Sequence, residues 1–599
     1  MLNSKDEESK HLIEYEVVRC IAGQPLFLKF GCRPIDYQDV LMMRDLKIFA
    51  GLSLLMVFFA CSKGGNTPTP DPVKPITPSS FSFDALKVNG VFNGYTYANV
   101  NKTPVIKITF STPVNKATVA SAVSLKDKAG VAVSFATSYE DSDNTIVIKP
   151  TLAVISKYTL DVSTTLRSSK DGALQSGVNV ALATGIDSTN KFTTISDNQL
   201  LDLVQKQTFK YFYDFGHPTS GLARERNTSG DVVTTGGSGF GIMAMVVGVN
   251  RGFISRAEGL ARMQKIVGFL KTKAQTFHGA FPHWLNGATG AVQPFSALDN
   301  GADLIETSYL MQGLLTARQY FNGAGNDETT LRADISTLWN NVEWDWFRQG
   351  DQNVLYWHWS PSNGWAINMK ISGWNEGLIA YVLAASSTTH SVPKAVYDQG
   401  WAGNGSMKNG NTYYGLKLPL GPPQGGPLFF AHYSFLGINP NGLSDAYANY
   451  EEQNKAHSQI NYKYTVANPK GYYGYSTESW GLTASDIEGG YTASSPTNDV
   501  GVIAPTAAIS SLPYTPTESM AALKFFYYKL GDKMWGPYGF YDAYNLNNPW
   551  FADSYLAIDQ GPIIVMIENY RSGLLWNLFM SCPEIKTGMK GLGFTSPNL

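Results

Sequence analysis

The sequence predicts a multi-domain protein in which an all-β sandwich precedes an all-α domain. Apolar and polar residues alternate from about residue 81 to 187, the apolar period becomes helical from about residue 196, and helix-start signals recur beyond that point. With 599 residues, 43% of them apolar, the chain is long enough for two or more domains with separate cores.

The N-terminal residues have the pattern of an export signal. Arg44 and Lys47 precede the apolar run 48–60, which is shorter than the roughly 20 residues of a membrane-spanning helix. Cys61 follows a small residue, as in a bacterial lipoprotein signal. We therefore expect an exported protein, periplasmic or attached to the outer membrane through lipid on Cys61. The corresponding segments are an over-extended start at 1–41, a lipoprotein signal peptide at 42–61 and a proline-rich tether at 62–80.

Short alternating segments predict the β-sandwich over residues 81–187. Ile106, Ile108 and Phe110 alternate with polar residues, and the same pattern recurs at 145–150 and 158–162. Turn residues separate these segments, so about 105 residues form several short strands.

Helix-start signals mark the second domain, which we place at 196–597. Three patterns resemble capping boxes, at Ser196, at Ser255 and at Thr515, the last with Pro516 at the first helical position. Helices that begin around one shared mouth would let their loops build a cleft. The other helical stretches are expected near 238–249, 302–321, 328–347, 374–386, 499–511, 516–530 and 562–579.

Charge and cysteine usage exclude several kinds of partner. The formal net charge is −2 and no basic block occurs, so neither nucleic acid nor an anionic membrane surface is expected. The eight histidines are scattered and show no metal-ligand spacing, so we expect no metal and no cofactor. If Cys61 carries lipid, Cys582 has no disulfide partner in the exported chain. We expect a monomer whose contact with a membrane is made only through the lipid.

Clustered acids provide the chemical signal. Asp299, Asp303 and Glu306 have spacings of four and three, which would place them on one helical face. Like charges at such separations repel, so they either point into water or surround a site that uses carboxylates. Glu376 and Asp559 also stand at apparent helix starts. A helix cap is the ordinary alternative for each acid alone. Because aromatic residues are frequent in nearby loops, the pattern favours sugar chemistry.

Two family resemblances extend this interpretation. Segments 106–114, 145–150 and 157–160 look like a bacterial Ig-like domain, a module that mostly serves as a spacer. The segment from about 196 to 595 resembles glycoside hydrolase family 144, the bacterial β-1,2-glucanases with an (α/α)6 toroid. The motifs that carry this second resemblance lie at 298–306, 373–377, 426–437, 478–486, 501–508, 558–562 and 566–570.

The resemblance implies roles for the acids. Inverting hydrolysis needs a protonated carboxyl and a carboxylate base, roughly 6.5–9.5 Å apart. We expect Glu376 to be the acid and Asp559 the base. Asp299, Asp303 and Glu306 are either the source of the base or a group that binds glucose hydroxyls, and among them Asp303 is the candidate catalytic residue. A proton relay through a substrate hydroxyl would loosen the distance requirement. Candidate substrate-binding residues are Asp299, Glu306, Trp284, Trp374, His432, Tyr433, Glu478 and Trp480, and further candidate ring platforms are Trp357, Trp359 and Trp550.

Three functions compete at this point. The first is an endo-β-1,2-glucanase, whose partner is a β-glucan oligosaccharide or polysaccharide, and the second is an exo-acting hydrolase that releases sophorose. The third is a non-catalytic glycan-binding surface lipoprotein. Clustered carboxylates favour an enzyme, because binding alone gains little from repelling charges. A uronate lyase would need clustered Arg or Lys, and the motif regions contain almost none.

Overall fold

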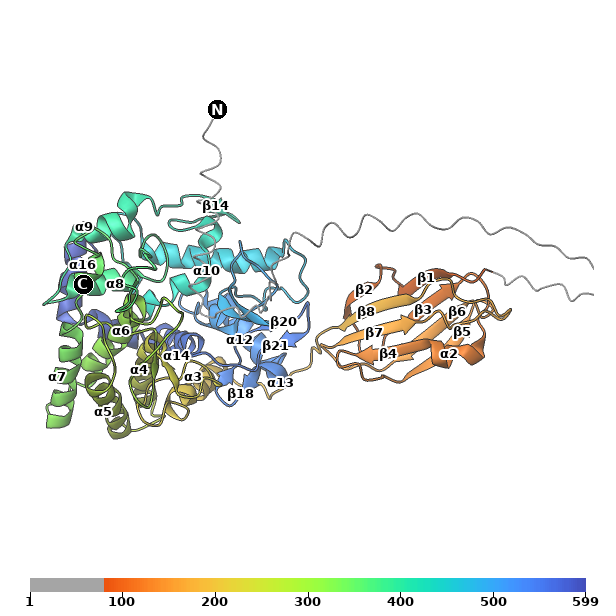
Figure 1. Ribbon diagram of the computed structural model, residues 1–599, viewed down its shortest axis with the longest axis horizontal. Coiled ribbons are helices and arrows are strands. Elements are labelled where there is room, and N and C mark those ends of the chain that lie inside the picture. Colours follow the sequence, from red (N-terminus) through yellow and green to blue (C-terminus); the bar gives the residue numbers. More distant parts are fainter. Residues whose placement is uncertain (1–79) are drawn as a thin grey trace, which may run out of the picture.

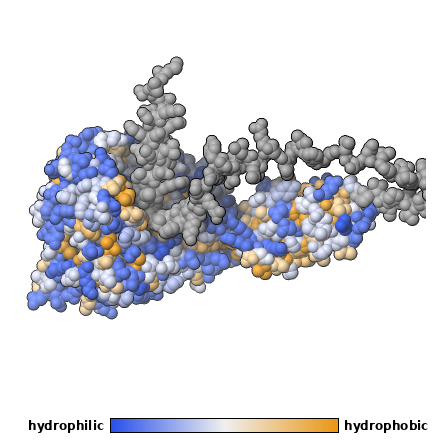
Figure 2. Space-filling view, in the orientation of Figure 1, coloured by the Kyte–Doolittle hydropathy of each residue, from blue (hydrophilic) through white to orange (hydrophobic). Residues whose placement is uncertain are grey.

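The computed structural model describes residues 80–599. Predictions for residues 1–79, which concern the over-extended start, the signal peptide, lipidation of Cys61 and nearly all of the tether, lie outside the described residues. Figure 1 shows a β-domain beside a larger, mainly helical domain. On the face seen in Figure 2, hydrophilic residues predominate and hydrophobic residues are scattered among them. Within residues 80–599, no helix combines the length and the apolar character that crossing a membrane requires.

The N-terminal domain has two four-stranded sheets with orders β1-β3-β6-β5 and β2-β8-β7-β4. The strands predicted from alternation are confirmed, because Ile106, Ile108, Ile146, Ile148 and Leu160 are fully buried in one core. A short helix, α2 (Lys116–Ala122), was not predicted. The strands are β1 (Phe83–Val88), β2 (Thr96–Val100), β3 (Ile106–Phe110), β4 (Val123–Asp127), β5 (Phe135–Glu140), β6 (Thr145–Pro150), β7 (Lys157–Val162) and β8 (Val178–Thr184).

Helices dominate the second domain, and short hairpins connect them. The helices are α3 (Asp197–Tyr213), α4 (Thr235–Asn250), α5 (Arg256–Thr272), α6 (Leu304–Tyr320), α7 (Asn326–Asn340), α8 (Leu378–Ser386), α9 (Lys394–Val396), α10 (Tyr450–Ala467), α11 (Pro505–Ile509), α12 (Pro516–Tyr528), α13 (Gly531–Met534), α14 (Ala557–Ser572), α15 (Leu574–Met580) and α16 (Pro583–Leu592). The short strands are β9 (Val232–Thr234), β10 (Trp284–Asn286), β11 (Val292–Gln293), β12 (Ala302–Asp303), β13 (His358–Trp359), β14 (Thr412–Tyr413), β15 (Leu416–Lys417), β16 (Ala484–Ile487), β17 (Gly490–Ala493), β18 (Trp535–Gly536), β19 (Gly539–Phe540), β20 (Tyr544–Asn545) and β21 (Trp550–Phe551).

Two of the three predicted capping boxes form. Ser196 with Gln199 starts α3, and Ser255 with Glu258 starts α5, each with both reciprocal hydrogen bonds. The third prediction was wrong: Thr515 precedes Pro516, but its side chain makes no capping bond. Its hydroxyl instead donates to the Ser511 carbonyl at 3.2 Å, because Thr515 lies buried against the preceding turn.

Several helix boundaries differ from prediction for local reasons. The stretch predicted at 562–579 divides at Gly573, whose positive φ of 68° ends α14. The stretch predicted at 499–511 contains only α11, which begins at Pro505. Helix α10 was missed because its buried face includes Gln453, Asn454 and Asn461, which hide the apolar period.

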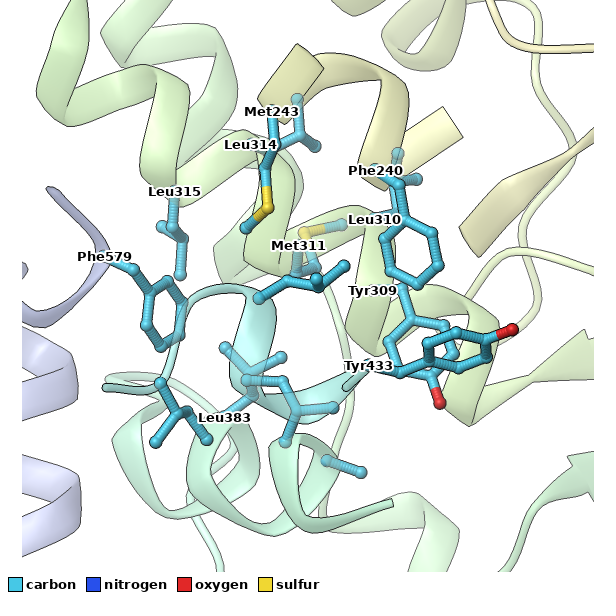
Figure 3. Packing of buried hydrophobic residues seen from close by; sticks show 14 of the residues in the cluster. Phe240, Met243, Tyr309, Leu310, Met311, Leu314, Leu315, Leu383, Tyr433 and Phe579 are labelled. Atoms are coloured by element: carbon cyan, nitrogen blue, oxygen red, sulfur yellow. The ribbon is translucent and has the colours of Figure 1, made fainter. Parts of the chain in front are cut away.

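Helices α4 and α6 cross at the centre of the helical domain and are buried on nearly all sides. Figure 3 shows Phe240 and Met243 of α4 packed beside Leu310 and Leu314 of α6. The crossing is close because Gly239 of α4 faces α6, where an added methyl would overlap the Tyr309 carbonyl. Helix α14 packs on the other side of α4.

We expect Gly239→Ala to destabilise the helical domain by about 2 kcal/mol, because the new methyl would force the two central helices apart. Unfolding in urea, followed by tryptophan fluorescence, measures the change. Gly268→Ala on α5 is the matched control. A methyl at Gly268 meets nothing within 4 Å, so the better helix propensity of alanine should stabilise by about 0.5–1 kcal/mol. Equal effects at the two positions would contradict this account of the crossing.

The two domains touch through apolar and polar contacts. Ile155 of the β-domain belongs to a hydrophobic cluster of the helical domain, and Val154 packs against the same cluster. Lys128 of the Ig-like sandwich forms a 3.0 Å ion pair with Glu488, which lies in the turn of the β16–β17 hairpin. Tyr473 accepts a hydrogen bond at 3.0 Å from the backbone N–H of Ile186 and contacts Asn99 at the same distance. The sandwich therefore contacts a hairpin of the helical domain as well as the connecting segment.

Candidate active site

A cavity lies where the central helices begin. It opens to solvent, and its volume is about 680 Å³ when the open space at its mouth is included. Thr234 at the start of α4, Glu306 in the first turn of α6 and Leu556 before α14 all contribute to its wall. Figure 3 shows Tyr309 and Tyr433 beside each other next to Phe240 of the core. The residues that line the cavity are Glu225, Thr234, His283, Trp284, Phe295, Ile305, Glu306, Tyr309, Trp357, Glu376, Phe429, Tyr433, Ala484, Tyr491, Leu556 and Ile558.

Glu376 lies in the wall of this cavity and is only 3% exposed. Burial raises the pKa of its carboxyl to about 8, and the charges of Asp303 and Glu306 add to the rise. The residue is held in place because the Ser434 hydroxyl and, at 3.4 Å, the Tyr309 hydroxyl donate to its carbonyl. Within residues 80–599 its Oε2 atom has no hydrogen-bond partner. Glu376 therefore presents a protonated carboxyl to the cavity at neutral pH.

The acids at the start of α6 do not share a helical face, so that prediction was wrong. The Asp303 carboxylate accepts from the backbone N–H groups of Ile305 and Glu306, so the helix begins after Asp303. Asp299 consequently lies in the preceding loop. Only Glu306 reaches the cavity, where it accepts from the Gly236 N–H at 2.6 Å. Burial raises the pKa of Glu306.

Asp303 is fully buried behind the cavity wall and binds two histidines. Its Oδ2 atom lies 2.9 Å from His283 Nδ1 and 3.3 Å from His358 Nε2. Burial alone would raise the pKa of Asp303, but the His358 charge and the His283 hydrogen bond hold it below its usual value. Although burial opposes it, the acids raise the pKa of His283 to about 9 and that of His358 to about 10. Asp303 therefore orients His283, which itself lines the cavity.

One group of candidate metal ligands occurs between residues 80 and 599, and it includes Asp303 and His283. His283, Asp299 and Asp303 present ligand atoms within 4.8 Å of one another. These atoms already form ion pairs, because Asp303 binds His283 and the Asp299 carboxylate lies 3.0 Å from His358 Nε2. The group fits a hydrogen-bonded network of two acids and two histidines.

A second cluster of acids surrounds Arg226, and Glu225 is the member of this cluster that lines the cavity. Arg226 forms ion pairs with Glu225 at 3.0 Å and with Asp486 at 3.2 Å. Asp542 accepts a 2.6 Å hydrogen bond from the Asp486 N–H, and its carboxyl interacts with that of the buried Asp559. Burial, together with the charge of Asp486, raises the pKa of Asp542 to about 7, and burial with Asp542 raises the pKa of Asp559 well above its usual value. One arginine thus faces four carboxyls, so its positive charge does not offset the rise in the pKa values of Asp542 and Asp559.

Tyr433 connects the two acid clusters. Burial raises the pKa of its phenol, and the charges of Asp559, Glu376 and Glu306 raise it further. Tyr491, also in the wall, is affected in the same way by burial and then by Asp559. Glu376 and Tyr433 therefore line the cavity together, whereas Asp559 is buried and directly follows Ile558, which also lines it.

Five of the predicted sugar-binding residues lie elsewhere, and one of them is Asp299 in the loop before α6. Trp374 is buried against Phe435 and Tyr450, and His432 is buried beside Ser511, with a pKa lowered by burial to about 3. Trp480 is buried and its indole N–H donates to the Glu518 carbonyl, while Glu478 is exposed in a loop. Trp374, Trp480 and His432 are therefore buried in the core and are not available to a sugar. By contrast, Trp284, Trp357, Tyr433 and Glu306 line the cavity.

Sequence reasoning missed several members of the site. Glu225, Arg226 and Asp542 lie in loops or beside short hairpins, where no periodic pattern marks them. The adjacent charged residues Arg224, Glu225 and Arg226, followed by a turn-forming segment, were the one available signal. His283 could have been noted because it stands next to Trp284.

Comparison with known proteins gives the family. Residues 368–583 match a family model described as "Putative glucoamylase", and residues 84–194 match a bacterial Ig-like domain. A crystallised protein of Bacteroides uniformis with that same glucoamylase description is 56% identical; the match covers 68% of this chain and 100% of that chain, with a TM-score of 0.67. The endo-β-1,2-glucanase of Chitinophaga pinensis, solved with sophorotriose and glucose, is 52% identical over 68% of this chain and 100% of that chain, with a TM-score of 0.66. The chain belongs to glycoside hydrolase family 144.

A further relative in the family has a different cleavage mode. The exo β-1,2-glucooligosaccharide sophorohydrolase (non-reducing end) of Parabacteroides distasonis is 48% identical over 419 residues, which is 66% of this chain. The chain spans 58% of the length of that curated relative. The predicted resemblances to glycoside hydrolase family 144 and to an Ig-like domain are confirmed. The helical character of the second domain is confirmed as well.

Proposed function

We propose that the protein hydrolyses β-1,2-glucan with Glu376 as the general acid. The observation that carries this proposal is a protonated carboxyl in a cavity wall, with a pKa of about 8 and an oxygen that has no partner among the described residues. A general acid must hold its proton at the working pH and must reach the leaving oxygen. The named β-1,2-glucan hydrolases among the relatives supply the substrate class.

Asp559 is the proposed base, acting together with Asp542. The pKa values of both carboxyls are raised, and we propose that the two carboxyls share one proton, so that the pair keeps one negative charge. Within the described part of the chain, Asp559 Oδ2 has no hydrogen-bond partner and can accept a proton from water. Glu225 and Glu306 line the same cavity and would bind glucose hydroxyls. Trp284 and Tyr433 offer ring faces for stacking on the sugar.

In this assignment hydrolysis proceeds with inversion. Glu376 gives its proton to the oxygen between two glucoses, while the Asp542–Asp559 pair takes a proton from the attacking water. Water adds at the anomeric carbon from the face opposite the leaving group. After release of both products, solvent returns the proton from the pair to Glu376.

For the cleavage mode we propose endo action. The Chitinophaga pinensis endo-enzyme is matched over its whole length, whereas the exo-enzyme is matched over 58% of its length. The test is a chromatogram of early products from long linear β-1,2-glucan. A ladder of oligosaccharides supports endo action, sophorose alone would establish the exo mode, and no product would reject hydrolysis. Proton NMR of the first product reports inversion, which requires the α-anomer.

Three further proposals concern architecture and location. The starts of α4, α6 and α14 around one cavity, and the position of Glu376 just before α8, support an (α/α)6 toroid. The signal-like residues 42–61 support export as a lipoprotein anchored at Cys61. We propose a monomer, and sedimentation of the purified protein tests that state. Labelling with a radioactive fatty acid, lost in a Cys61→Ala variant, tests the lipid anchor.

A further inference from the structure

A second hollow lies beside the catalytic cavity, between two hairpins. Its volume is about 590 Å³. One wall is the turn of the β16–β17 hairpin, and the other is β21 with the segment that follows it. We call this hollow the Trp550 groove. Among the residues that line it are Arg226, Asp486, Gly489, Trp550, Asp553 and Ser554.

The two walls of the Trp550 groove are held together by side-chain bonds. The Ser554 hydroxyl donates to Asp486 at 2.5 Å, and the Asn548 side-chain amide donates to Glu488. Lys128 of the Ig-like domain pairs with the same Glu488 at 3.0 Å. Because bonds span the groove from one hairpin to the other, its shape is formed before any ligand enters.

The lining of the groove suits a pyranose ring. Trp550 is half-buried, and no other described aromatic ring pairs with it, so a face of its indole is available for stacking. Arg226 Nη2 is buried and has no hydrogen-bond partner in residues 80–599, while Asp553 is exposed. A free donor and a carboxylate acceptor match the alternating hydroxyl groups of a sugar.

The groove and the catalytic cavity are lined by neighbouring residues of the same elements. Glu225 lines the cavity, and its neighbour and ion-pair partner Arg226 lines the groove. The β16–β17 hairpin likewise places Tyr491 on the cavity and Gly489 on the groove. A glucan chain that leaves the cavity along this hairpin would meet Trp550 next.

We infer that the Trp550 groove is a glucose-binding subsite for a chain unit remote from the cleaved bond. This inference rests on the proposed function. Such a subsite would make the enzyme prefer long β-1,2-glucan to short oligosaccharides. Remote contacts of this kind bind substrate and transition state alike, so they lower KM for long chains. The Ig-like domain, through Lys128 and Glu488, supports the rim of this subsite.

The test compares Trp550→Ala with the unaltered protein on two substrates, long β-1,2-glucan and a trimer. For Trp550→Ala we expect KM for the long glucan to rise about tenfold and kcat to stay unchanged. KM for the trimer should change less than twofold. Trp550→Phe keeps a ring and should retain most of the affinity. Tyr570→Ala removes a 44% exposed ring elsewhere on the surface and should change neither KM.

Direct binding separates this inference from the proposed function. In a Glu376→Gln background, calorimetric titration with long β-1,2-glucan should show the same tenfold loss when Trp550 is changed to Ala. If the unaltered protein cleaves β-1,2-glucan and Trp550→Ala leaves KM and binding unchanged, the subsite is rejected while the activity stands. If the unaltered protein neither cleaves nor binds the glucan, the proposed function is rejected, and the proposed subsite is rejected with it. Melting temperatures of all variants show whether each one folds, and Asp553→Ala provides a second groove variant should Trp550→Ala unfold.

Discussion

Replacing Glu376 by glutamine is expected to lower kcat on β-1,2-glucan by about 10²- to 10⁴-fold, the usual contribution of a general acid. Glutamine has nearly the same shape and keeps the packing of a side chain that is only 3% exposed, but it cannot release a proton. Binding of glucan should therefore survive the change. Steady-state kinetics measure the loss, and calorimetric titration measures the remaining affinity.

The pH profile gives an independent check on Glu376. Its pKa is raised to about 8, chiefly by burial, so the active protonated form persists below pH 8 and is lost as the pH rises through that value. An ordinary glutamate would lose its proton near pH 4.5. We expect kcat/KM to decline above about pH 8.

Glu478→Gln is the matched control for Glu376→Gln, because Glu478 is exposed and lies outside the cavity. It should leave kcat and the pH profile unaltered. Retention of more than a tenth of the activity in Glu376→Gln would remove this residue from the role of acid, and another carboxyl of the cavity would have to supply the proton.

Changing Asp559 to asparagine is expected to cost a similar factor of about 10² to 10⁴ in kcat. The variant keeps the shape of the buried side chain but removes the carboxyl that is proposed to take the proton from water. Asp532→Asn, on the exposed side of α13, is the matched control. A rate near that of the unaltered protein in Asp559→Asn would be incompatible with the proposed base.

Asp542→Asn separates the two members of the pair. Both the charge of Asp542 and its hydrogen bond raise the pKa of Asp559, after burial. Removing Asp542 should lower that pKa, so activity would extend to more acidic pH while kcat stays within about tenfold of the original value. A shift of the acidic limb to higher pH would contradict the coupling of the two carboxyls.

Local sequence patterns were sufficient to predict much of the fold. Alternation at Ile106, Ile108 and Phe110 predicts β3, and the boxes at Ser196 and Ser255 predict the starts of α3 and α5, because backbone hydrogen bonding and burial act within a few residues there. Helix α10 was missed for the opposite reason. Its polar Gln453 and Asn461 are buried because distant backbone groups bind them, at Leu420 and Leu482.

The residues of the site also include some that the sequence indicated and others that it did not. Glu376 could be singled out from sequence because it accompanies a family motif at a helix start. Its neighbours could not be assigned: Trp374, adjacent in sequence, packs into the core, whereas Asp542 and Arg226 come from distant loops. The position of a residue in the sequence decides which element carries it. Packing decides which residues of that element face the cavity.

The amino-acid sequence alone determined the succession of a β-domain and a helical domain, the family, and the candidate acid Glu376, because each depends on periodicity or on a contiguous motif. Only the tertiary structure decided which carboxyls share one cavity and which of them hold a proton. Those properties arise from burial and from charges of residues hundreds of positions apart, such as Arg226 and Asp559, whose interaction exists only after the chain has folded.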